Sequence, residues 1–102
     1  MKLKDIAKIV RSKNAGPFYV TIDILFESLE DYNRVKAGKA LTPELVASLY
    51  RTPVEKIRYF ESDAARAFKF TIPRVYPSGD VRDSDIYGAQ QHAPLLDIEV
   101  GT

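Results

Sequence analysis

The stretch that decides the fold is Phe18-Tyr19-Val20-Thr21-Ile22-Asp23-Ile24-Leu25-Phe26. Every even position in it is apolar, whereas the odd positions include a threonine and an aspartate. Side chains alternate between the two faces of a strand, so this pattern predicts a strand with one fully apolar face. Such a face needs a second layer to cover it, and the helices predicted elsewhere in the chain supply that layer.

Two helices are predicted directly after this strand. Ser28 is a favourable N-cap for the first helix, and Gly38 ends it. Thr42 caps the second helix, and Pro43 stands in its first turn, where a missing backbone N–H breaks no hydrogen bond. This second helix ends by Pro53 and should bury four apolar side chains: Leu45, Val46, Leu49 and Tyr50.

Two more strands are predicted over residues 57–61 and 67–72, joined by a turn over residues 62–66. Three side chains of the later strand should share one face: Phe68, Phe70 and Ile72. Residues 6–10 are ambiguous, because their apolar spacing fits either a strand or a short helix. Residues 73–85 read as a long loop.

The order of these elements favours one fold class. It is strand, strand, helix, helix, strand, strand, and then a final helix that Pro94 interrupts. We predict an α+β fold in a single domain over residues 1–102, with about four antiparallel strands and the helices on one face of the sheet.

The composition excludes several classes of function. The chain has no cysteine, which removes disulfides, thiolate catalysis and cysteine-ligated metal sites. Its 15 basic and 14 acidic residues are mixed along the sequence, so no basic stripe indicates a nucleic-acid partner. No window approaches the ~20 apolar residues of a membrane span, and the first residues lack the apolar run of a signal peptide. We therefore predict a cytoplasmic protein with no membrane or nucleic-acid partner.

The aromatic side chains are predicted to pack in the core rather than to stack on nucleobases. The positions considered are Tyr19, Tyr59, Phe60, Phe68 and Phe70. Their rings coincide with the buried alternation of the predicted strands, and basic residues are not concentrated beside them in the sequence.

A polar, cationic turn is predicted between the first two apolar runs, at Arg11-Ser12-Lys13-Asn14-Ala15-Gly16-Pro17. Arg11 can hold a carboxylate or phosphate in bidentate fashion, Lys13 adds a point charge, and Gly16 permits close approach of the backbone. Ser12 and Asn14 complete a candidate site for an anionic small molecule. The alternative is an ordinary hairpin turn in which Arg11 pairs with a nearby carboxylate.

His92 is the only histidine in the chain and the only candidate general base that we single out. Tyr87, Gln90 and Gln91 precede it and could line a polar pocket with it at the edge of the sheet. We expect this segment and the cationic turn to project from the same end of the sheet. The alternative is a histidine at a helix end or an interface. One imidazole does not make a metal site, and we predict neither a metal nor a cofactor.

These segments resemble known families. The Arg-Ser pair followed by a glycine-containing turn, together with residues 88–100, resembles the ferredoxin-like domain that ends acyclic-terpene-utilisation proteins. The chain resembles more closely a small stand-alone microbial family catalogued only as a domain of unknown function, with signature segments at residues 11–17, 63–66 and 87–94. The resemblance implies a ferredoxin-like domain that accompanies a larger subunit in acyl-CoA or terpenoid-type catabolism. It implies no known reaction.

Two functions remain in contention. The first is an accessory domain or small subunit that assembles with itself or with a larger enzyme and has no catalytic activity alone. The second is a protein that binds an anionic, CoA-linked or similar small molecule, or acts on it, through residues 11–16 and His92. Unpaired strand edges also favour self-association.

Overall fold

The computed structural model describes residues 1–74 and 93–100 of the chain. Its centre is strand β2 (Tyr19–Leu25), which pairs with β1 (Ile9–Asn14) on one side and with β4 (Ala67–Pro73) on the other. Strand β3 (Arg58–Ser62) pairs with the far side of β4. All pairs are antiparallel, and the strand order is β1-β2-β4-β3.

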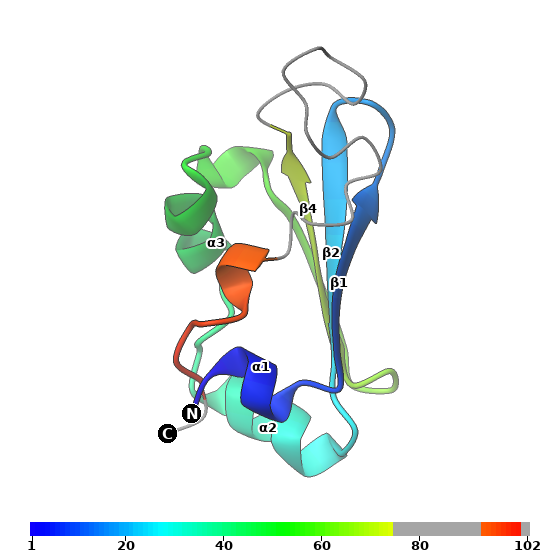
Figure 1. Cartoon of the computed structure of the whole chain (residues 1–102), viewed down its shortest axis with the longest axis vertical. Helices are drawn as coiled ribbons and strands as arrows, with labels where there is room; N and C mark the ends of the chain where they lie inside the picture. The colour runs from blue at the N-terminus through cyan, green and yellow to red at the C-terminus, as the bar shows by residue number, and fades with distance from the viewer. Residues whose placement is uncertain (75–92, 101–102) are drawn as a thin grey trace.

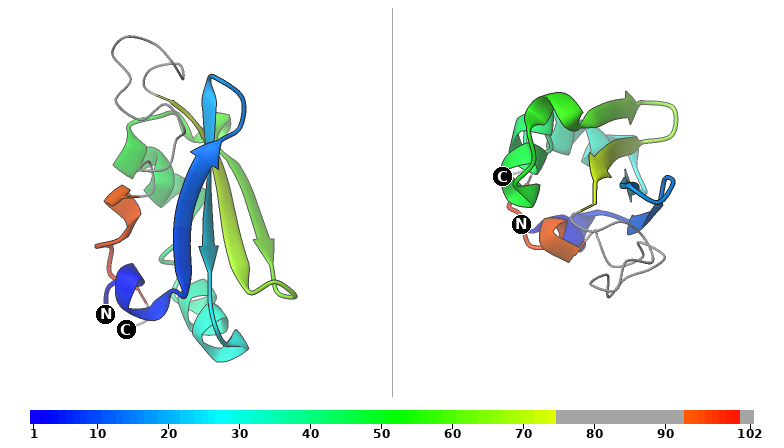
Figure 2. Two further views of the ribbon diagram at one scale, coloured as in Figure 1. Left: turned by 45° about the vertical axis from the view of Figure 1, so that its right-hand side comes forward. Right: turned by 90° about the horizontal axis from the view of Figure 1, so that it is seen from above.

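The helices lie on one face of this sheet, as Figures 1 and 2 show. They are α1 (Leu3–Ile6), α2 (Leu29–Ala37), α3 (Pro43–Tyr50) and the short 3₁₀ turns η1 (Val54–Lys56) and η2 (Ala93–Leu95). The α+β class and the four-stranded antiparallel sheet are therefore confirmed. The described chain runs β-β-α-α-β-β, whereas a ferredoxin-like chain runs β-α-β-β-α-β. The ferredoxin-like connectivity that the resemblance implies is not confirmed.

The starts of both longer helices follow the predicted capping chemistry. The Asp31 N–H donates to Ser28 Oγ at 3.1 Å, and the Leu45 N–H donates to Thr42 Oγ1 at 3.2 Å. Each hydroxyl oxygen thereby satisfies one of the backbone donors that a helix leaves free in its first turn. Gly38 is the C-cap of α2, as predicted.

Helix α3 buries a different set of side chains from the set that the sequence predicted. Val46 and Ala47 are buried, whereas Leu45 and Leu49 keep 36% and 37% of their surface exposed. The helix contacts the core along a narrow seam, so side chains on either side of that seam stay in solvent. The chain then leaves the helix through Arg51 in the left-handed conformation, before Pro53.

Residues 6–10 contain parts of both predicted alternatives. Helix α1 ends at Ile6, and strand β1 begins at Ile9. Leu3 of α1 is fully buried, and its N–H donates to the Ile98 carbonyl at 2.9 Å. Val100 is also buried, so the segment that follows η2 packs against the start of the chain.

The core lies between the helices and one face of the sheet. Its centre consists of alternating residues of β2 and β4 that are at most 1% exposed: Val20, Ile22, Ile24, Phe68, Phe70 and Ile72. The Tyr32 ring of α2 lies 5.0 Å from the Phe68 ring, centroid to centroid. Phe26 is also buried as predicted, but Phe18 is 60% exposed because it precedes the first residue of β2.

Two phenylalanines on neighbouring strands allow a matched test of this core. Phe70 is fully buried, and Phe60 is 63% exposed on the opposite face of the sheet. We expect Phe70→Ala to lower the free energy of unfolding by about 3–5 kcal/mol, because it leaves a cavity. Phe60→Ala should change it by about 0.5 kcal/mol or less. Chemical denaturation measures both, and equal losses would contradict the assignment of faces.

Candidate functional site

The residues predicted as a cationic turn do not lie in one turn. Arg11, Ser12, Lys13 and Asn14 belong to strand β1, and only the residues after Asn14 leave it. Alternation along the strand turns Arg11 and Lys13 to one face of the sheet, while Ser12 pairs with Ile22 on the core side. The prediction that these residues form a turn is therefore corrected, and a ligand-binding role for Arg11 and Lys13 stays a prediction.

Gly16 lies in the turn between β1 and β2, with a φ of +82°. A side chain is strained in this left-handed conformation, so the backbone favours glycine here. Among the described residues, no atom lies within 4 Å of where a Cβ would stand. The bend therefore accounts for the glycine, and the close approach of a ligand to its backbone stays a prediction. Asn14, at the start of the turn, accepts a hydrogen bond from the Arg74 side chain.

The second half of the predicted site lies outside the described residues. This holds for Tyr87, Gln90, Gln91 and His92. The shared pocket with the cationic segment, and the role of His92 as a general base, stay predictions.

The sheet has a second face, turned away from the helices, which we call the open face (Figure 2). Strand register arranges it in rows that run across the strands. One row is Arg11, Asp23, Lys69 and Phe60, and the next is Lys13, Thr21, Thr71 and Arg58. No described helix covers these side chains, although Thr21 and Asp23 are themselves buried among their neighbours.

One end of the open face holds what we call the Phe60 hollow, of about 310 Å³. Asp23 lies at its centre, with a side chain only 11% exposed. Its carboxylate is 3.5 Å from the Arg11 Nε and 3.9 Å from the Lys69 Nζ. Two cations of this hollow, Arg11 and Lys69, are therefore paired with a nearly buried anion, and Phe60 is an exposed ring in the same lining.

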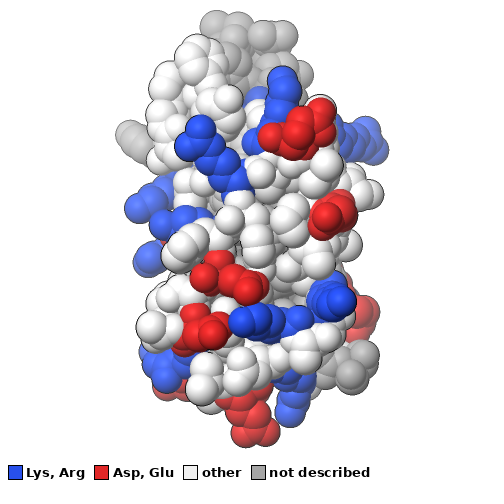
Figure 3. All heavy atoms as spheres, turned by 180° about the vertical axis from the view of Figure 1, so that it is seen from behind, with Lys and Arg blue, Asp and Glu red and all other residues white. Residues whose placement is uncertain are grey.

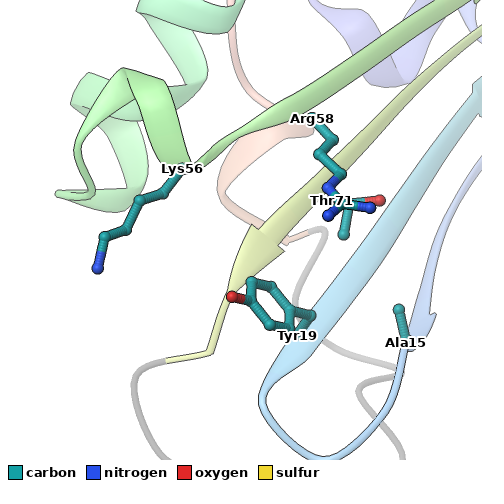
Figure 4. A pocket seen from close by; sticks show the side chains of 5 residues that line it. All are labelled: Ala15, Tyr19, Lys56, Arg58 and Thr71. Carbon is teal, nitrogen blue, oxygen red and sulfur yellow. The ribbon is translucent and has the colours of Figure 1, made fainter.

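The other end holds the Tyr19 hollow, of about 290 Å³ (Figure 4). Its described lining is Ala15, Tyr19, Lys56, Arg58 and Thr71. In Figure 4 the Arg58 guanidinium lies beside Thr71, the Tyr19 ring lies between Ala15 and Lys56, and Lys56 extends outward at the rim. The hydroxyls of Thr21 and Thr71 are 3.2 Å apart.

The open face carries a strong excess of positive charge. The described residues that line its two hollows include one carboxylate, Asp23, and five cations: Arg11, Lys13, Lys56, Arg58 and Lys69. The whole chain has a formal net charge of only +1. Within residues 1–74 and 93–100, no carboxylate lies within ion-pair distance of Lys13, Lys56 or Arg58. On the side seen in Figure 3, acidic and basic side chains are interspersed.

Sequence reasoning missed this collection of charge because the cations come from four separate segments. The signal that could have found part of it is spacing by two, as in Arg11 and Lys13. In a strand this spacing places both side chains on the same face. The prediction that no basic surface exists rested on the linear mixture of charges, which pairing between strands rearranges.

The predicted burial of the aromatic side chains is also corrected. Phe68 and Phe70 are buried, but Phe60 and Tyr19 are 63% and 45% exposed on the open face. Tyr59 is half-buried, and its ring lies 5.0 Å from that of Phe70. This sheet therefore does have exposed rings beside cations, whereas the sequence predicted buried rings without basic neighbours.

A second cluster of charged groups connects α2 to the turn between β3 and β4. Lys36 Nζ lies 3.1 Å from Asp63 Oδ1 and 3.4 Å from Glu61 Oε1. The Tyr32 Oη is buried and has no hydrogen-bond partner within 3.5 Å in the described chain. The Tyr32 hydroxyl and then Lys36 hold the pKa of Asp63 below its usual range. Because the Tyr32 hydroxyl has no hydrogen-bond partner within 3.5 Å, the Lys36 contact at 3.1 Å is the main cause of the lowered pKa of Asp63.

The pKa values of the groups in this cluster are shifted further from neutral pH. Burial first, and then Asp63, raise the pKa of Tyr32 to about 12. The hydrogen bond to Asp63 raises the pKa of Lys36, although partial desolvation opposes that rise. A general acid or base works best with a pKa near the pH of the reaction. The cluster is therefore an ion-pair network that joins two elements, not a proton-transfer site.

The described residues contain no group of three or more histidine, cysteine, aspartate or glutamate side chains that could hold a metal ion. Among the same residues, no helix has the length and apolar character needed to span a bilayer.

Comparison with known proteins gives one match. A sequence-family model described as Domain of unknown function (DUF4387) matches residues 3–99. Neither a curated protein nor a solved structure matches the chain significantly.

The Lys36–Asp63 contact predicts a specific pH dependence. The pKa of Asp63 is lowered in the folded state, so its contribution to stability is complete above the ordinary aspartate pKa of about 3.9. That contribution is lost as the pH falls through the lower folded-state value. Asp63→Asn should therefore reduce Tm at neutral pH, and the difference from wild type should shrink at about pH 3 and below.

Thermal unfolding followed over this pH range measures the effect. Glu55→Gln is the control, because Glu55 makes no ion pair among the described residues. A constant difference in Tm between Asp63→Asn and wild type at all pH values would show that the pair contributes nothing.

Proposed function

Because the chain belongs to this family of domains of unknown function, we propose its function from the open face: the protein is a non-catalytic accessory domain that docks through this face onto an acidic surface of a larger protein. The observation that carries the proposal is the exposed Phe60 ring, 63% accessible, beside a group of cations on the face of the sheet that no described helix covers. An exposed aromatic ring with a charged surround is a common composition for the centre of a protein interface.

The positive charge of the open face determines which kind of partner can bind there. Two copies of this chain that met through their open faces would bring five cations against five. Like charges placed against one another cost several kcal/mol across an interface. The open face therefore favours a different, acidic protein. Self-association, which we also predicted, would have to use another surface, such as the outer edge of β3.

The absence of poised catalytic groups supports an accessory role over an enzymatic one. Every resolved pKa shift in the described residues moves a group away from neutral pH: upward for Tyr32, Lys36, Tyr50 and Tyr59, and downward for Asp63 and Asp97. Such groups keep their protonation state near neutrality instead of exchanging protons with a substrate.

The resemblance described above supports a narrower form of the proposal. In that form the larger protein is an enzyme of acyl-CoA or terpenoid-type catabolism, and the two proteins meet in the cytoplasm. The alternative, a protein that binds an anionic small molecule, is favoured by one separate observation, the unpaired cations of the Tyr19 hollow.

The docking proposal predicts that capture of a partner depends on charge at specific positions. Lys13→Glu combined with Lys69→Glu reverses two charges on the open face. Lys39→Glu combined with Arg51→Glu makes the same change in net charge away from it. We expect the wild-type chain and the control to retain a larger protein from native extract at about 1:1 stoichiometry, and the open-face variant to lose it. The interaction should also weaken as salt concentration rises.

The captured material is analysed by mass spectrometry, which identifies a protein partner, and by absorbance at 260 nm, which detects nucleic acid. Equal capture by the two double variants would overturn docking through the open face. Nucleic acid in place of protein in the eluate would also overturn it, and would reassign the face to a nucleic-acid partner.

Phe60 provides a second prediction for the same interface. Truncating an aromatic anchor at the centre of an interface commonly costs 2 kcal/mol or more, which corresponds to about 30-fold in Kd. We expect Phe60→Ala to weaken binding to the captured partner by roughly this factor. Leu29→Ala is the control, because Leu29 is also an exposed apolar residue, at 49%, but lies on α2. Equal Kd values for the two variants, measured by calorimetry, would remove Phe60 from the interface.

A further inference from the structure

The Tyr19 hollow differs from the Phe60 hollow in how its cations are balanced. In the Phe60 hollow, Asp23 lies within 4 Å of both Arg11 and Lys69. In the Tyr19 hollow, neither Lys56 nor Arg58 has a carboxylate within ion-pair distance among residues 1–74 and 93–100. Cations without a counter-charge favour an incoming anion. The Arg58 guanidinium lies beside Thr71, whereas Lys56 extends outward at the rim of the hollow (Figure 4).

The hollow also offers hydrogen-bond donors of the right kind. Arg58 presents a planar guanidinium beside Thr71 (Figure 4), and such a group binds phosphate oxygens in bidentate fashion. The Thr71 hydroxyl, which lines the hollow, lies 3.2 Å from the Thr21 hydroxyl. When Thr71 accepts the hydrogen bond from Thr21, its own proton is available to donate to a ligand.

A ring completes the site. Tyr19 is 45% exposed and lies in the same hollow, between Ala15 and Lys56 (Figure 4). Exposed tyrosine rings stack on planar aromatic groups. At about 290 Å³, the hollow is at the small end of ligand sites, which suits a compact ligand.

We propose that the Tyr19 hollow binds a phosphate monoester that carries a planar aromatic ring, with the phosphate held by Arg58, the charge of Lys56 at the rim adding to the attraction, and the ring stacked on Tyr19. A purine nucleoside monophosphate has this chemistry. The site is separate from the Phe60 end of the open face, and its two cations are not those reversed in the docking test. The two proposals can therefore fail independently.

The test is titration of the full chain with adenosine 5′-monophosphate, adenosine and inorganic phosphate, followed by backbone amide NMR shifts. We expect saturable shifts around Tyr19, Arg58 and Thr71, with the monophosphate binding at least about tenfold more tightly than adenosine. Lys56→Gln combined with Arg58→Gln should remove this advantage. Lys39→Gln combined with Arg51→Gln, with the same change in net charge, should leave it unchanged.

Tyr19→Leu tests the ring separately. This variant should bring the affinity for the monophosphate down to that for inorganic phosphate, while binding of inorganic phosphate itself stays the same. Since all three altered side chains are exposed, the dispersed amide spectrum of each variant serves as the check that it is folded. The proposal is overturned if the monophosphate gives no saturable shifts, if the Lys56/Arg58 variant binds it as wild type does, or if wild type binds it no more tightly than inorganic phosphate.

Discussion

Strand β2 is hydrogen-bonded on both sides, to β1 and to β4, and its side chains alternate between two different environments. Ile22 and Ile24 face the core and are fully buried, whereas Thr21 and Asp23 face the open side of the sheet. A shift of register by one residue would place the aspartate in the core and the isoleucines in solvent, so the register is strongly specified. Because β2 is central, its register also determines which residues of β1 and β4 reach the open face.

Asp23 makes the two ends of the open face different. Its side chain is only 11% exposed, and burial of a carboxylate is costly unless opposite charges lie beside it. Arg11 and Lys69 supply them, from the strands on either side of β2. Their charges are thereby partly balanced, and Phe60 is the feature that distinguishes this end. At the Tyr19 end the cations have no such anion, so attraction for an external anion concentrates there.

The features that sequence reasoning predicted well are local ones. A helix that begins at Ser28 or Thr42 depends on a side chain that bonds to a backbone N–H three residues later. The buried face of β2 likewise follows from a period of two within a single strand. The open face depends instead on pairs far apart in sequence, such as Asp23 with Lys69. Strand β3 adds an ambiguity, because Tyr59 and Phe60 are adjacent aromatic residues and only the pairing with β4 decides which one faces the core.

The shifted pKa values of the described residues support the docking role that we propose. The groups with shifted pKa values, such as Tyr32 at about 12 and the lowered Asp63, are fixed more firmly in the protonation states that they already hold at neutral pH. Proton transfer needs the opposite arrangement. The open face combines lysine and arginine charges, a rigid four-stranded support and two exposed rings. The backbone of such a surface is in place before anything binds, and its selectivity comes from charge and from ring stacking.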